Sequence, residues 1–405
     1  MRKGVTGFQG RRLTQARESL GLTQSSLARA IGMSSAAISR WERGEQFPET
    51  DALAQLSEKL STPSSWFLKP VKEYGTQPYF FRSQAAATKL ARSIAKSRIE
   101  YLHEISLKIQ EFVELPEVNI PCVESTDHRV LRDEDIESIS RDLRRHWKFG
   151  LGPISDILLA MENAGVVVAR DEIGYSNMDG LSKWFEEDSR PYVLLAKDKD
   201  NPMRQRFDTS HELGHLVLHR YLGDIEFNSR YSEIERQANV FASSFLMPAE
   251  SFSNDVTSPS LDTFLALKPK WKVSAAAMIS RSKQLGIISE DFATRLWKNY
   301  SARGWRKGEP GDDQIVAEQP RLLGRAMNLL IEDGGFQANQ ITDEICLSET
   351  DVERLASLPE GFFSRTSAKV VRLALKAKSD AHEAKQGESV TAVNANVIDI
   401  GRKIG

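Results

Sequence analysis

Residues 209–219 read TSHELGHLVLH and hold three histidines at intervals of four residues. On a helix, His211 and His215 lie on the same face, one turn apart. Two imidazoles placed in this way can bind one tetrahedral Zn²⁺ ion. Glu212 projects near such an ion, off the line of the ligands, where it can accept and pass on protons. Because the five-residue pattern also arises by chance, it needs a third ligand from elsewhere in the chain.

The third ligand is expected on the helix that residues 233–248, EIERQANVFASSFLMP, predict. Glu235 and Asn239 are four residues apart and share one face, while the opposite face is apolar. Glu235 is therefore the expected ligand, and Asn239 is expected behind it, orienting an imidazole or Glu235 itself. Glu233 is the competing ligand, although its offset of two residues places it on another face.

The surroundings of this site are less well defined by the sequence. His219 lies one turn beyond His215, and we expect it to cap the helix end or to form a local hydrogen bond rather than to bind metal. As donors to an oxyanion, Tyr221, Arg206 and His219 are candidates only. The apolar stretch 191–197 predicts a strand just before the histidines. An extended substrate could pair with this strand through backbone hydrogen bonds, or the strand could belong to the core.

A second motif lies in residues 22–44, LTQSSLARAIGMSSAAISRWERG, which predict two short helices joined by a tight break. Thr23 and Ser34 are the expected N-caps. Ile38 and Trp41 are spaced to anchor the second helix on a core. The residues expected to face outward on this second helix are Ser34, Ser35, Ala36, Ala37, Ser39, Arg40 and Arg43.

A helix with short side chains at its start and arginines further along fits the major groove of DNA. Arg40 is the best candidate for contact with a base edge, because its guanidinium matches guanine O6 and N7. Gln24 and backbone amides at helix N-termini could hold phosphates. Residues 1–43 carry eight basic and two acidic side chains, although the net charge of the chain is -2. The segment predicts a DNA-binding head, with a small helical interaction module as the alternative.

Both motifs resemble known families. The N-terminal segment, including the WERG turn and Pro48, resembles the Cro/repressor (XRE) type of helix-turn-helix, which implies that the second helix reads DNA and that the domain acts as a dimer. RFDTSHELGHLVLH followed by ERQANVFASSFLMP resembles the ImmA/IrrE family of zinc metallopeptidases. That resemblance implies a peptidase with a gluzincin-like fold, which cleaves repressor proteins under stress or during mobile-element induction. It also implies that His211, His215 and Glu235 bind zinc and that Glu212 is catalytic.

The expected fold class is α+β and mainly helical: a helix-turn-helix bundle, a gluzincin-like peptidase domain with a small sheet, and a helical C-terminal region. Strands are expected at 166–170 and 191–197, with a loop or hairpin between them. The expected domains are a DNA-binding domain at 1–70, a connector with a long polar helix at 71–125, a zinc metallopeptidase domain at 126–312, and a helical region with a polar tail at 313–405.

Composition narrows the setting of the protein. Hydrophobic residues make up 40% of the chain and charged residues 27%, which is typical of a globular protein. There are two cysteines, Cys122 and Cys346, without CxxC spacing, so a reducing cytoplasm is the expected compartment. The basic N-terminus lacks an apolar run, which argues against a signal peptide, and no segment is apolar enough to span a membrane.

The expected function is that of a DNA-binding transcriptional regulator with its own zinc endopeptidase. The partners would be a double-stranded DNA operator and a protein substrate, which is either the chain itself or a partner repressor or antitoxin. The alternative is a transcription factor or antitoxin-like protein whose zinc domain is a sensor or scaffold without turnover. The intact Glu212 favours the first function, because a structural metal site needs no base.

Overall fold

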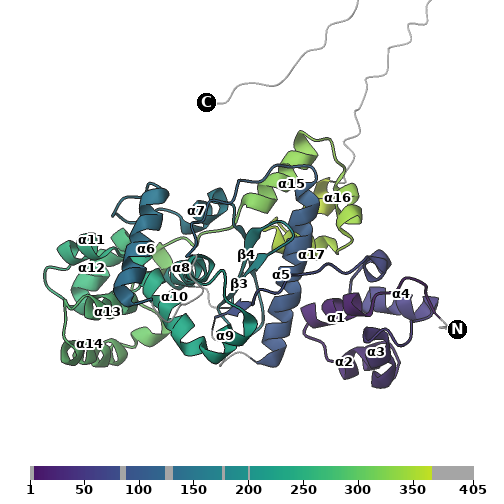
Figure 1. Ribbon diagram of the computed structural model, residues 1–405, viewed down its shortest axis with the longest axis horizontal. Coiled ribbons are helices and arrows are strands. Elements are labelled where there is room, and N and C mark those ends of the chain that lie inside the picture. Colours follow the sequence, from purple (N-terminus) through teal and green to yellow (C-terminus); the bar gives the residue numbers. More distant parts are fainter. Residues whose placement is uncertain (1–3, 83–87, 124–130, 176–177, 199–200, 367–405) are drawn as a thin grey trace, which may run out of the picture. The chain divides into compact units, whose positions relative to one another are not determined.

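Figure 1 shows the computed structural model of the protein. Helices make up most of the described residues, and one four-stranded sheet lies among them. The fold is therefore α+β and mainly helical, as the sequence predicts. The polar tail expected at the C-terminal end lies outside the described residues. The ranges that the structure describes are 4–82, 88–123, 131–175, 178–198 and 201–366.

The N-terminal head (residues 4–70) is a bundle of short helices whose starts are fixed by capping side chains. The Thr23 hydroxyl accepts a hydrogen bond from the backbone N–H of Ser26 (3.0 Å), and the Ser34 hydroxyl accepts one from that of Ala37 (3.2 Å). Both expected N-caps are therefore confirmed. The helices are α1 (Gly10–Ser19), α2 (Gln24–Ala30), α3 (Ser35–Glu42), α4 (Thr50–Lys59) and the 3₁₀ helix η1 (Ser64–Leu68).

The sheet has the strand order β1-β3-β4-β2. Strand β2 runs parallel to β4, while β3 pairs antiparallel with both β4 and β1. Strand β4 is thus hydrogen-bonded on both sides, so the suggestion that a substrate pairs with residues 191–197 is wrong. The bounds are β1 (Phe80–Phe81), β2 (Val167–Asp171), β3 (Gly180–Phe185) and β4 (Arg190–Ala196).

Helix α5 (Lys89–Gln110) lies where the sequence predicts a connector with a long polar helix. It contacts α1 of the head, strands β3 and β4, and the C-terminal helices. Fourteen of its residues are buried, several of them charged. The burial is possible because these charges have partners: Arg98 pairs with Asp171 (2.9 Å), and Glu104 accepts a hydrogen bond from Arg12. The expected domain boundaries themselves stay a prediction.

Helix α8 (Pro202–Leu218) carries the histidines and starts at a strong signal. The Asn201 side chain accepts hydrogen bonds from the N–H groups of Met203 and Arg204, and Pro202 takes the first helical position. The neighbouring helices are α6 (Asp133–His146), α7 (Ile157–Asn163), α9 (Asp224–Ser229), α10 (Tyr231–Leu246), α11 (Ala249–Asp255), α12 (Leu261–Trp271), α13 (Ala275–Gln284) and α14 (Glu290–Ala302). Two 3₁₀ turns follow them, η3 (Trp305–Lys307) and η4 (Asp312–Gln314).

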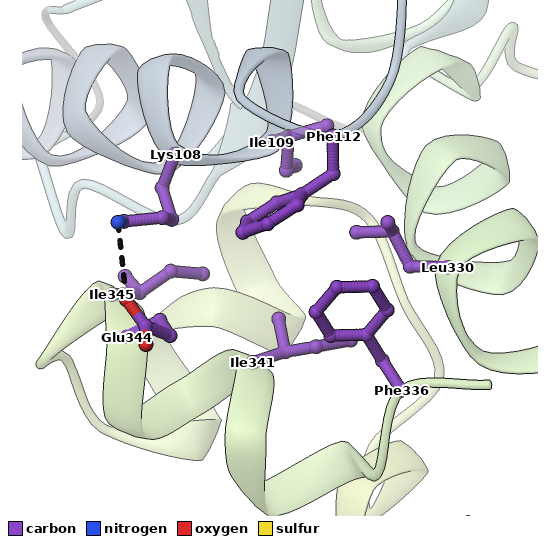
Figure 2. A pocket seen from close by; sticks show the side chains of 8 residues that line it. All are labelled: Lys108, Ile109, Phe112, Leu330, Phe336, Ile341, Glu344 and Ile345. Atoms are coloured by element: carbon purple, nitrogen blue, oxygen red, sulfur yellow. Dashed lines mark hydrogen bonds and ion pairs between the residues drawn. The ribbon is translucent and has the colours of Figure 1, made fainter. Parts of the chain in front are cut away.

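The C-terminal helices pack back on α5, as Figure 2 shows for the pocket between them. The rings of Phe112 and Phe336 meet edge to face with centroids 4.9 Å apart. At the rim, Lys108 Nζ lies 3.1 Å from a carboxylate oxygen of Glu344. The expected helical C-terminal region is thus present in the part described. Its helices are α15 (Leu322–Glu332), α16 (Ala338–Ile345), α17 (Glu349–Leu355) and α18 (Phe362–Thr366).

Candidate metal centre and DNA-binding helix

Helices α8 and α10 approach each other closely at Gly214. A Cβ atom on this glycine would lie 3.2 Å from the carbonyl oxygen of Ala238 and 3.2 Å from the side chain of Phe241. A larger residue would therefore push the two helices apart. The close packing brings the histidine face of α8 within reach of polar side chains on α10.

The expected ligands come together between the two helices. The Nε2 atoms of His211 and His215 are 3.0 Å apart. Glu235 places one carboxylate oxygen 3.5 Å from His211 Nε2 and the other 3.2 Å from His215 Nε2. One donor atom from each of the three residues lies within 4.8 Å of the others. The competing Glu233 instead pairs with Arg230 (2.6 Å), as its place on another face predicts.

Hydrogen bonds behind the histidines indicate which nitrogen of each ring carries a proton. Asn239 Oδ1 lies 3.0 Å from His211 Nδ1, so this nitrogen donates and His211 Nε2 keeps its lone pair. Gln237 Oε1 accepts from His219 Nε2, so His219 Nδ1 accepts from His215 Nδ1; both distances are 3.0 Å. His215 Nε2 then also carries a lone pair instead of a proton.

Two lone pairs therefore face each other beside a carboxylate, and a cation bound between them would offset their repulsion. Both imidazoles are fully buried, and burial lowers the pKa of His211 to about 4, so protonation of that ring does not supply the charge. Two neutral imidazoles and one carboxylate are a donor set that suits Zn²⁺.

Glu212 lies next to these ligands, held by a residue of the sheet. The Ser182 hydroxyl donates a hydrogen bond to Glu212 Oε2 (2.6 Å), while Glu212 Oε1 has no hydrogen-bond partner within the described ranges. A Cβ atom at position 180 would lie 2.8 Å from Oε1, so Gly180 leaves the room that this carboxylate occupies. Burial raises the pKa of Glu212 to about 7, which suits a group that both accepts and releases protons near neutral pH.

Several residues around the site have no signal in the sequence. Ser182 lies on β3, within the segment expected to be a loop or hairpin, and Phe80 lies on β1, where no strand is expected. Gln237 lies off the Glu235–Asn239 face of α10. His219 caps α8 and forms a local hydrogen bond, as expected.

The candidate oxyanion donors have other roles. Arg206 pairs with Glu318 and donates to the carbonyl of Ile154 (2.7 Å), and both ring nitrogens of His219 are used. Tyr221 is 45% exposed, and its ring lies 5.4 Å from the Arg220 guanidinium.

Helix α3 presents most of the expected DNA-contacting side chains to solvent. Ser34, Ala36, Arg40 and Arg43 are exposed, and Ser35 and Ser39 are partly so. Ala37 is only 8% exposed, so its predicted outward position is wrong: the residue lies on the same side as Ile38 and Trp41, in the core.

Two of the polar candidates already have partners within the head. Gln24 Nε2 donates to Glu42 (2.7 Å), and Arg43 pairs with Glu45 (2.6 Å). Arg40 contacts the backbone carbonyl of Ala36 (3.3 Å), which leaves its terminal nitrogens available. Arg40 is therefore the better placed of the two arginines to reach a base.

Comparisons with known proteins match two parts of the chain. Residues 161–283 match the family model of the IrrE N-terminal-like domain of peptidase family M78, and residues 13–67 match that of a helix-turn-helix. The chain combines a helix-turn-helix domain with an IrrE N-terminal-like domain. The first match contains all the expected ligands, and the second contains all the expected DNA-contacting residues.

Two repressor-like relatives match the head. Over 64 residues, 16% of this chain, it is 36% identical to repressor protein C2 of Salmonella phage P22, of which it covers 30%. Over 59 residues, 15% of this chain, it is 39% identical to the HTH-type transcriptional regulator DicA of Escherichia coli (strain K12), of which it covers 44%. The chain thus spans less than half the length of either relative. Across the described part of the chain, no helix is long and apolar enough to cross a membrane.

Proposed function

We propose that this helix-turn-helix regulator carries a zinc-dependent endopeptidase, which cleaves the chain itself or a partner repressor or antitoxin and so switches gene expression. The observation that carries the proposal is the pair of imidazole Nε2 atoms facing the Glu235 carboxylate, with Glu212 beside them. A structural metal site would need the ligands but not the base.

His211, His215 and Glu235 would hold the metal, and Asn239 and His219 would orient the two imidazoles. A bound Zn²⁺ ion supplies a Lewis acid that polarises a peptide carbonyl and makes water more acidic. Glu212 accepts the proton of the attacking water on Oε1 and passes it to the leaving amine. Ser182 keeps that carboxylate oriented by its hydrogen bond to Oε2.

The head supplies the second half of the function. Helix α3 would enter the major groove, with Arg40 at a base edge and Gln24 or the helix N-termini near phosphates. A homodimer bound to a palindromic operator would fit a head of this kind, and a cytoplasmic location would fit both activities.

A second function is favoured by one observation. His211, Glu212 and His215 are fully buried, and the ring of Phe80 stacks on His215 with centroids 5.0 Å apart. A site closed in this way suits a zinc sensor or scaffold in a transcription factor or antitoxin-like protein that cleaves nothing.

Both functions need the metal centre, which one variant tests, and a second variant separates them. Bound zinc per chain is measured by elemental analysis in the wild type, in Glu235→Ala and in the control Glu233→Ala on the same helix. We expect about one zinc per chain in the wild type and control, and a clear loss in Glu235→Ala. In a reporter assay, Glu212→Gln should keep zinc and DNA binding but lose the regulatory response. A wild-type response from Glu212→Gln would favour the sensor.

A further inference from the structure

The outer edge of strand β3 lies beside the candidate metal centre, and a short stretch of the chain is paired with it. Strand β1 runs antiparallel to β3, with Phe80 opposite Ser182 and Phe81 opposite Leu181. The backbone N–H of Arg82 donates to the carbonyl of Gly180 (3.2 Å). Residues directly opposite each other in a sheet point to the same face. Phe80 therefore shares the face of Ser182, which holds Glu212.

Phe80 packs in an apolar cluster beside the metal centre. Its ring stacks on His215 at an interplanar angle of 14° and meets Phe227 edge to face at 5.2 Å. Leu222 and Ile234 complete this cluster of buried residues. The ring covers a proposed ligand from the side of the sheet, where the side chain of a bound peptide would lie.

Arg82, two residues further along and on the same face, lies among carboxylates. It forms an ion pair with Asp208, and Arg204 pairs with Asp179 (2.9 Å) and lies 3.7 Å from Asp208. The negative charges of Asp179 and Glu212 also act on Arg82. The position therefore attracts a positively charged side chain.

We propose that the edge of β3 is a peptide-binding groove for an extended segment with an aromatic residue followed, two positions later, by arginine. Residues 80–82 of the chain occupy this groove as an internal inhibitor. Backbone pairing gives such a groove its affinity, and alternate side chains give its selectivity. This inference rests on the proposed peptidase function: it names the class of peptide that the peptidase binds and the segment that inhibits it.

The inhibiting segment is also tied to the head. The hydroxyl of Tyr79, the residue before β1, donates to Glu100 on α5 (2.9 Å). Glu100 accepts further hydrogen bonds from Gln15 (2.6 Å) and Arg11 (3.3 Å) of α1. A shift of α1 would therefore move Glu100 or break its hydrogen bonds, and so disturb Tyr79, the residue next to the groove.

The first arm of the test measures how fast zinc leaves the loaded protein in an excess of chelator. Arg82→Asp places a third negative charge beside Asp179 and Asp208 and should release the segment. We expect zinc loss to become about tenfold faster, because local opening then costs less. The control Arg145→Asp makes the same charge change at an exposed pair with Asp142 and should leave the rate unchanged.

The second arm uses metal-free protein and a synthetic peptide with the sequence of residues 77–82, QPYFFR. We expect it to bind Arg82→Asp at least about tenfold more tightly than the wild type, whose groove is occupied. A peptide with aspartate in place of its arginine should bind neither. Equal binding to variant and wild type, or binding to neither, would overturn the proposal. If Arg82→Asp does not fold by circular dichroism, Arg82→Gln takes its place in both arms.

These arms separate the inference from the proposed function. A wild type that holds no zinc would defeat the peptidase function, while the peptide arm would still decide whether residues 80–82 occupy a groove. Zinc that leaves variant and wild type at equal rates would contradict the covering role of the segment.

Discussion

His215 and His219 form a hydrogen bond between their Nδ1 atoms, which are 3.0 Å apart. Only one of these two atoms can carry the proton. The side-chain oxygen of Gln237 accepts a hydrogen bond from His219 Nε2, so His219 Nδ1 is the acceptor and His215 Nδ1 carries the proton. His215 Nε2 is thereby directed at Glu235 without a proton. A histidine that touches no other proposed ligand thus prepares one for metal binding.

Replacing His219 by alanine should therefore weaken zinc binding about 10- to 100-fold, as loss of a partner behind a metal ligand typically does. The measurement is a competition for zinc against a chelator of known affinity. His146→Ala is the matched control, since His146 is exposed and contacts Asn119 rather than any proposed ligand. Equal zinc affinity in His219→Ala and the wild type would show that the hydrogen bond does not orient His215.

Gly214→Val should destabilise the fold by about 1–3 kcal/mol, since its branched side chain would enter space that α10 already fills. Urea unfolding gives the free energy of unfolding. Gly223→Val is the control, because no atom lies within 4 Å of a Cβ built at Gly223. Comparable losses from both substitutions would mean that close packing of α8 on α10 is not what position 214 requires.

Much of the site could be predicted because its key pairs are local. His211 and His215, like Glu235 and Asn239, are one helical turn apart, and a turn of helix fixes which residues share a face. The N-caps Thr23 and Ser34 are local signals of the same kind. The hydrogen bond that Asn239 forms with His211 follows from two such faces meeting.

The remaining features depend on pairings between distant segments. Ser182 reaches Glu212 only because the register of β3 places it there, and β1 is two residues long, too short for a periodic pattern. The sequence predicts α5 as a polar connector because it is rich in charged residues. Several of these charges are buried, since they have partners far along the chain, such as Arg12 for Glu104. Residue type alone does not reveal such partners.

The buried Lys183 should make stability depend on pH. Burial lowers its pKa to about 8, below the usual value of 10.5, although its ammonium group donates to the carbonyl of Gln77. Between these two pH values the unfolded chain binds more protons, so the free energy of unfolding should rise with pH. The rise should be on the order of 2–3 kcal/mol.

Lys183→Met isolates this contribution, because methionine fills similar space without a charge. Its free energy of unfolding, minus that of the wild type, should fall as pH rises from about 8 to 10.5. Urea unfolding at several pH values measures this difference. A difference that stays constant over that range would mean that Lys183 keeps its usual pKa in the folded protein.

Arg40 should contribute more to DNA recognition than Arg43, although both are exposed on or beside α3. Arg43 is held by Glu45 (2.6 Å) and must break that pair to reach DNA, whereas the terminal nitrogens of Arg40 are available. Arg40→Ala should weaken operator binding by about 1–3 kcal/mol and relax the preference at one base pair. Arg43→Ala should weaken all sequences to a similar, smaller extent, and should flatten the salt dependence. Titrations of each variant against the operator and single-base variants at two salt concentrations test this. If Arg43→Ala alone changes the base preference, the reading residue is Arg43, and its pair with Glu45 must open on binding.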